Sequence, residues 1–122
     1  MKLSQLSTTS IDQLVETYRD AAKQHGEASE KADHKTANKA AELVAAIYSE
    51  LRRRGVEAQM ALLPLLVDPA PGVRLWSASH ALEFSPTEGE TCLKQLISGE
   101  RLLGLSGDMT LKEWRAGRLK FQ

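Results

Sequence analysis

Apolar residues recur at helical spacing along this chain, and no stretch of any length alternates apolar and polar residues as a strand does. Ser10 to Gln13 has the pattern of a capping box, in which the serine oxygen accepts an N–H of the first helical turn. An apolar stripe follows from Ile11 through Tyr18 to His25, and Gly26 is suited to end the helix. The pattern predicts an all-α fold.

Five further helices follow from the same periodicity and from glycine and proline punctuation. We expect residues 1–9 to be a frayed tail that can contain one turn around Leu3 and Leu6, and Leu102 to Leu105 to be a packed loop or short turn. The expected ranges are about 30–54, 56–67, 73–84 and 86–99, with a bend at Pro64 in the second and a serine cap at Ser85 before the fourth. A last helix is expected to start at Ser106 or Asp108 and to end at Gly117. Short connections make sequential helices antiparallel neighbours.

The helix over 56–67 is apolar on most of its sides, so we expect it to be the most buried element. The predicted core consists of Leu14, Tyr18, Val44, Ile47, Leu51, Leu62, Leu63, Leu66, Val73, Leu82, Leu93, Leu96 and Ile97.

Size and composition place the chain among ordinary globular proteins. Its 122 residues suit one domain, 1–122, and its 16 basic and 16 acidic side chains give a formal net charge of zero. This balance argues against a bulk attraction to nucleic acid. One cysteine, Cys92, excludes an internal disulfide, and no signal peptide or membrane span is evident. We therefore expect a cytoplasmic protein with no membrane association.

Two segments carry a resemblance to known helical-repeat families. Residues 61–66 match residues 92–97 in pattern, and LLPLLVDPAPGVRLWSASHAL resembles one HEAT unit through Leu65, Leu66, Asp68, Val73, Arg74, Ala78, Ala81 and Leu82. Together with GLSGDMTLKEWRAGRL, it resembles a small bacterial family that is classed as a domain of unknown function and has an armadillo-like fold. The resemblance implies a right-handed α-α superhelix of about three antiparallel helix pairs. It transfers no catalytic residues.

The candidate binding residues lie in the second half of the chain. Trp76 and His80 fall on one face of the helix over 73–84, where they either pack in the core or line an exposed concave surface near Glu83. Trp114 is either a binding residue or part of the packing at the end of the core. Asp68 and Arg74 bracket a proline-rich loop, as in HEAT units, and we expect an ion pair or hydrogen bond there that ties the loop down.

Three classes of function remain open from the sequence. The leading prediction is a protein-binding or adaptor module, which could be an immunity-type partner or a homodimer formed through an uncovered C-terminal patch containing Leu111, Trp114, Leu119 and Phe121. The second is a small-molecule binder or enzyme using a pocket near His80. The third is weak nucleic-acid binding through Arg52, Arg53 and Arg54. No catalytic motif, metal-ligand spacing or cofactor motif is present, so we expect a non-enzyme without metal or cofactor.

Overall fold

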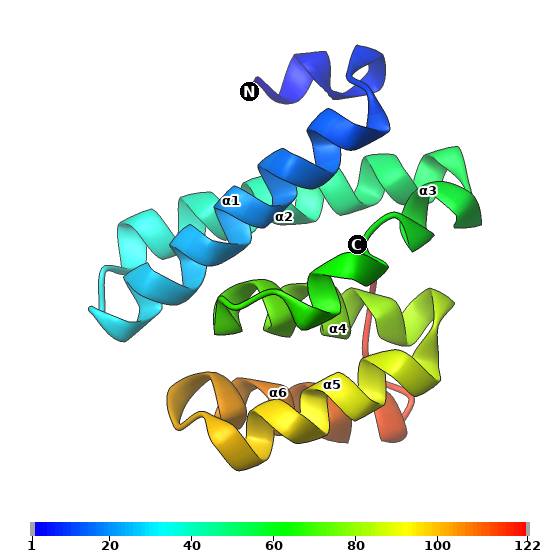
Figure 1. Ribbon diagram of the computed structural model, residues 1–122. Helices are drawn as coiled ribbons and strands as arrows, with labels where there is room; N and C mark the ends of the chain where they lie inside the picture. The colour runs from blue at the N-terminus through cyan, green and yellow to red at the C-terminus, as the bar shows by residue number, and fades with distance from the viewer. Residues whose placement is uncertain (1, 122) are drawn as a thin grey trace.

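The computed structural model describes residues 2–121, and over that range the chain is built from helices without a strand (Figure 1). The prediction of an all-α fold is confirmed. The α-helices are α1 (Ile11–Glu30), α2 (His34–Arg54), α3 (Val56–Met60), α4 (Pro71–Phe84), α5 (Pro86–Gly99) and α6 (Leu102–Arg115). Two 3-10 helices, η1 (Leu3–Thr8) and η2 (Leu63–Val67), precede α1 and α4. No helix in the described range is long and apolar enough to cross a membrane.

The helices form three layers, with α1 and α2 in the first, α4 with η2 in the second, and α5 with α6 in the third (Figure 1). Helix α4 packs on α1 on one side and on α5 and α6 on the other. In the view of Figure 1, α2, α4 and α6 lie behind α1, η2 and α5. Each layer therefore places one helix toward the same side of the molecule.

Helix α4 is the buried centre, which corrects the prediction that residues 56–67 hold that place. Val73, Ala78 and Ala81 of α4 are fully buried, whereas Val67 is 85% exposed. The segment 56–67 is not one helix: α3 ends at Met60, and the chain tightens into η2 around Pro64. Proline has no N–H for an α-helical bond and its ring clashes with the preceding turn, so the apolar stripe loses its phase there.

Two glycines that the sequence presents as helix breakers lie inside helices. Helix α1 continues past Gly26, where an added Cβ would lie 3.0 Å from the Cα of Gly72 on α4. Gly104 lies within α6, where an added Cβ would lie 2.9 Å from the carbonyl oxygen of Leu96. Both glycines allow two helix backbones to approach closely, and residues 102–105, expected to be a packed loop or short turn, form the first turn of α6.

The N-terminal segment forms η1 around Leu3 and Leu6, where the sequence allows one turn, and is not the frayed tail expected over residues 1–9. Leu6 is buried, and its carbonyl oxygen accepts a hydrogen bond from Nη2 of Arg54 at 2.8 Å. The next helix begins as predicted, because Oγ of Ser10 accepts the N–H of Gln13 at 3.2 Å. At Ser85 the hydroxyl instead donates to the carboxylate of Glu88 and makes no bond to a backbone N–H.

Most of the predicted core is buried, in two clusters that meet at α4. The exceptions are Leu63 and Leu66, which are half-buried on η2, and Ile97, which is 37% exposed on α5. Leu63 and Leu66 lie on either side of Pro64 in η2, where side chains turn by the tighter 3-10 repeat. Ile97 lies at the edge of the α5–α6 contact, beside Gly104.

Candidate functional site

His80 is the centre of a buried polar cluster that joins the first two layers. Its Nδ1 lies 2.6 Å from the hydroxyl oxygen of Tyr18 on α1. Its imidazole also stacks on the ring of Tyr48 on α2, with centroids 3.8 Å apart and planes 3° from parallel. Rings from two other helices therefore fix the position of the His80 side chain.

Burial sets the protonation state of this cluster. It lowers the pKa of His80 to about 3 and raises the pKa of Tyr18 well above its ordinary value, so both groups are neutral near pH 7. The Tyr18 hydroxyl has no other hydrogen-bond partner in residues 2–121, so we infer that it donates to Nδ1 and that the ring proton of His80 resides on Nε2. His80 consequently offers an N–H donor from Nε2.

Glu83 belongs to a second branch of polar contacts, one helical turn beyond His80. The hydroxyl of Tyr48 donates to Oε1 of Glu83 at 2.5 Å, and Nε of Arg52 lies 2.9 Å from Oε2. Nε2 of Gln59 donates to the Tyr48 hydroxyl at 2.9 Å. Burial and the neighbouring Glu83 raise the pKa of Tyr48, so its hydroxyl stays protonated. The carboxylate of Glu83 is thus engaged by α2 and α3 rather than directed to a ligand.

Trp76 is held by a histidine that the sequence analysis did not select as a site residue. The indole Nε1 donates to Nδ1 of His25 at 3.1 Å, and the two rings meet edge to face with centroids 5.1 Å apart. Burial lowers the pKa of His25. The seven-residue spacing from Tyr18 to His25 puts both on the face of α1 that meets α4. This spacing is the sequence feature that could have indicated His25 as a site residue.

Trp76 and His80 line a partly open cavity of about 290 Å³ between α4, α6 and the C-terminal segment, called here the α4–α6 cavity. After α6, the chain turns at Gly117 and runs back past α4 (Figure 1). The apolar lining residues are Leu75, Trp76, Leu119 and Phe121, and the polar ones are His25, Ser79, His80, Ser106, Thr110 and Lys120. Trp76 and His80 are therefore brought together, as their spacing on one helix face predicts.

Trp114 and Glu83 do not line the α4–α6 cavity. Trp114 is half-buried and packs against the core cluster shared by α4, α5 and α6. Leu111 is buried, and Leu119 and Phe121 are half-buried. The C-terminal residues thus cover the end of the core and form one wall of the cavity, instead of leaving the apolar patch that the sequence analysis expected.

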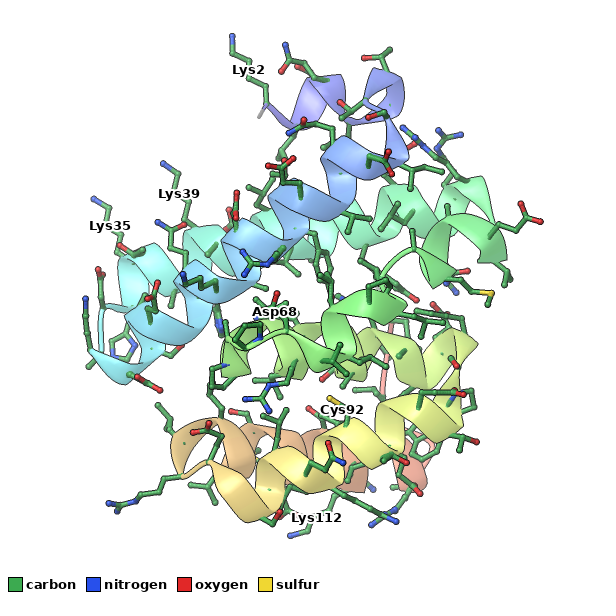
Figure 2. The ribbon with its side chains drawn as sticks, viewed as in Figure 1. Lys2, Lys35, Lys39, Asp68, Cys92 and Lys112 are labelled. Carbon is green, nitrogen blue, oxygen red and sulfur yellow. The ribbon has the colours of Figure 1, made fainter. Side chains whose placement is uncertain are left out.

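The expected link between Asp68 and Arg74 is absent from the described structure. Oδ2 of Asp68 instead lies 2.6 Å from Nε of Arg19 on α1, and Oδ1 accepts the N–H of Ala70 at 2.9 Å. In Figure 2, Asp68 is labelled between α1 and α4. Arg74 lies 3.9 Å from Glu100, and its Nε is buried without a partner in the described range. Asp68 still ties the loop down, but to α1, since the first turn of α4 directs Arg74 toward α5 and Glu100.

The arginines at the end of α2 are all paired with carboxylates. Arg52 pairs with Glu83, and Arg53 and Arg54 pair with Glu50 at 2.6 and 2.7 Å. Hydrogen bonds from Arg53 and Arg54 lower the pKa of Glu50 to about 2. These pairs compete with phosphate contacts, which weakens the case for nucleic-acid binding.

Metal ligands do not gather anywhere in residues 2–121: no group of three or more His, Cys, Asp or Glu side chains there could hold an ion. Cys92 is buried, and its Sγ lies 3.5 Å from the carbonyl oxygen of Leu66. Burial raises the pKa of this thiol, which keeps it protonated and unreactive.

The fold is similar to that of a solved protein. The crystal structure of the protein RPA1889 from Rhodopseudomonas palustris CGA009 superposes with a TM-score of 0.87, covering 96% of this chain and 98% of that one at 23% sequence identity. At this identity the likeness bears on the fold alone. A comparison with proteins of curated function finds no match. The family described as a domain of unknown function, DUF2019, matches residues 12–113, and the chain belongs to that family.

Proposed function

We propose that this protein is a binding module whose ligand is a small molecule held in the α4–α6 cavity. The observation that carries the proposal is the convergence of the Trp76 ring, the His80 imidazole and several hydroxyl groups on one cavity of about 290 Å³. Apolar walls with a few oriented polar groups are typical of ligand sites. A flat or filled surface at His80 would have favoured the adaptor function that the sequence analysis placed first.

The cavity walls are held in place by contacts outside the cavity. Tyr18 and Tyr48 fix the His80 ring, and His25 fixes the Trp76 indole. Side chains that are already ordered lose little conformational entropy when a ligand binds. This pre-organisation supports a binding site rather than an incidental gap in the packing.

Binding without catalysis is the better account of His80. A general base works best when its pKa lies near the operating pH, and burial holds the pKa of His80 at about 3. Its Nδ1 is bonded to Tyr18, and the carboxylate of Glu83 is bonded to Tyr48 and Arg52. The two residues that would form an acid–base pair are thus engaged in structural contacts.

The repeat architecture inferred from the sequence is part of the same proposal. Three antiparallel pairs, α1 with α2, the α3–η2 segment with α4, and α5 with α6, are consistent with a right-handed HEAT- or armadillo-like superhelix. In such proteins the second helices of the pairs line the concave binding face. Trp76 and His80 come from α4, and Ser106 and Thr110 come from α6, which are both second helices in this scheme.

A second candidate function is protein recognition through the outer face of α6. Leu102, Leu105 and Met109 form a stripe at helical spacing, and they are 45%, 66% and 68% exposed. A second copy of the chain is the simplest partner for this stripe. Sedimentation analysis of the wild type and of Leu105→Glu with Met109→Glu tests it. A wild-type dimer lost in the double variant would support this function, and a monomeric wild type at high concentration would exclude the homodimer.

A thermal-shift screen with small aromatic fragments tests the cavity proposal. Ligands that bind the native state raise the melting temperature by mass action. Ser106→Phe should fill the cavity from α6 and abolish the shifts, because Ser106 is an exposed residue that lines it. Ser98→Phe is the matched control, on the exposed surface of α5 and outside the cavity lining. No stabilising fragment, or equal shifts in Ser106→Phe, would overturn the proposal.

A further inference from the structure

We propose that the ligand of the α4–α6 cavity is a small organic acid, with a planar apolar body between Trp76 and Phe121 and a carboxylate that meets Lys120. This inference rests on the proposed function and adds the chemical class of the ligand. It is based on the charge and hydrogen-bonding character of the lining side chains.

The cavity lining contains one formal positive charge and no acidic side chain. Lys120 is the charged lining residue, and no Asp or Glu lines the cavity. No carboxylate in residues 2–121 forms an ion pair with Lys120. The acidic residues of α6, Asp108 and Glu113, pair with Lys112 and Arg118 at 2.8 and 2.9 Å. The two carboxylates of α6 are therefore paired outside the cavity, which leaves Lys120 as the formal charge of the lining.

The polar groups that remain available in the cavity are hydrogen-bond donors. Nδ1 of His80 accepts a hydrogen bond from the Tyr18 hydroxyl, and Nδ1 of His25 accepts one from the Trp76 indole. Each neutral ring therefore carries its proton on Nε2. The hydroxyl of Ser106 has no partner in the described range. Donors without a protein acceptor match a ligand that supplies acceptor oxygens, and a carboxylate supplies two.

Two hydroxyl groups of the lining already donate to backbone carbonyl oxygens, so they are not available as donors to a bound anion. Oγ of Ser79 donates to the carbonyl oxygen of Leu75 at 2.7 Å, and Oγ1 of Thr110 donates to that of Ser106 at 2.9 Å. The uncommitted donors thus belong to Lys120, Ser106 and the two imidazoles. They come from four different elements that surround the apolar rings.

The size and the apolar walls determine the body of the ligand. Leu75, Trp76, Leu119 and Phe121 supply the apolar lining of a cavity of about 290 Å³. This volume lies just below the roughly 300–1,000 Å³ found for ligand pockets, which suits a body of one or two rings. Flat rings of this kind stack on indole and phenyl faces.

A matched pair of probes, 2-naphthoate and its neutral isostere 2-naphthamide, tests the inference by calorimetric titration of the full chain. We expect naphthoate to bind about tenfold more tightly than naphthamide, as a hydrogen bond to a charged group provides. Lys120→Gln should remove this preference. Lys23→Gln, which removes an equal charge from the exposed surface of α1 outside the cavity lining, should keep it.

The outcomes separate this inference from the proposed function. Equal wild-type affinities for the two probes would overturn the organic-acid inference and leave the cavity as a binding site. A preference that persists in Lys120→Gln would overturn the assignment of the carboxylate to Lys120. Failure of both probes to bind would overturn the organic-acid inference together with the small-molecule function.

Discussion

The hydroxyl oxygen of Tyr18 on α1 lies 2.6 Å from Nδ1 of His80 on α4, and both side chains are buried. This one contact joins two layers of the fold and fixes the tautomer of a residue that lines the α4–α6 cavity. The stability of the core and the chemistry of the cavity therefore depend on the same pair of atoms.

Replacing Tyr18 with Phe should lower the free energy of unfolding by about 1–3 kcal/mol. The variant keeps the ring and its packing but leaves Nδ1 of His80 buried without its donor. Urea denaturation measures the loss. A value below about 0.5 kcal/mol would show that the hydroxyl contributes little, contrary to the short distance between the two atoms.

Stability should depend on pH through His80. Its folded pKa of about 3 lies below the ordinary value of 6.5, so between these values the unfolded chain binds the additional proton. The free energy of unfolding should fall as the pH falls through this window, by up to about 1.4 kcal/mol per pH unit from this group. Its contribution is complete above pH 6.5.

Urea denaturation of the wild type and His80→Gln, from pH 7.5 to pH 4, isolates this contribution. The carboxylates titrate in both proteins, so the difference in slope reports His80. Identical slopes would mean that the folded and unfolded chains take up the His80 proton over the same pH range, contrary to a pKa lowered by burial. His34→Gln, which removes an exposed imidazole, is the matched control.

The proline-rich connection should be stabilised through Arg19 rather than Arg74. A double-mutant cycle of Arg19→Gln with Asp68→Asn should give a coupling energy of about 1–2 kcal/mol, because Nε of Arg19 lies 2.6 Å from Oδ2 of Asp68. The same cycle with Arg74→Gln should give a coupling near zero. A larger coupling energy for Arg74 than for Arg19 would contradict this prediction and support the link between Asp68 and Arg74 that the sequence predicts.

The contact between α1 and α4 should tolerate no side chain at Gly72. An added Cβ would lie 2.7 Å from the carbonyl oxygen of Ala22, so Gly72→Ala should cost about 1–3 kcal/mol of stability. Gly99→Ala is the control, since nothing lies within 4 Å of its added Cβ. It should leave stability unchanged or raise it by about 0.5 kcal/mol. Equal effects in thermal unfolding would show that the helices can move apart at little cost.

Local signals in the sequence predict which segments are helical better than they predict where each helix ends. The serine cap at Ser10 is correct, because cap chemistry is set by neighbours in the chain. The start of α5 at Pro86 is also correct, although the Ser85 hydroxyl does not cap it. Gly26 and Gly104 have the same local signature as a helix end, but they serve close helix packing. Only the neighbouring helix distinguishes the two roles, and periodicity along one helix contains no information about it.

The candidate site was predictable in part for the same reason. Trp76 and His80 share a face of one helix, so their spacing predicts that they lie together. His25, Ser106 and Lys120 reach the cavity from other elements, and no spacing within α4 indicates them. The sequence predicts that Asp68 pairs with the nearby Arg74, whereas its partner Arg19 lies 49 residues away.

The most direct test of the account is a two-dimensional ¹H–¹⁵N NMR titration that follows the two tryptophan indole N–H signals as 2-naphthoate is added. The chain has two tryptophans, and Trp114→Phe assigns the signals. Trp76 lines the α4–α6 cavity and Trp114 does not. The account predicts a saturable shift of the Trp76 signal while the Trp114 signal stays in place. No shift of the Trp76 signal, or a larger shift of the Trp114 signal, would contradict it.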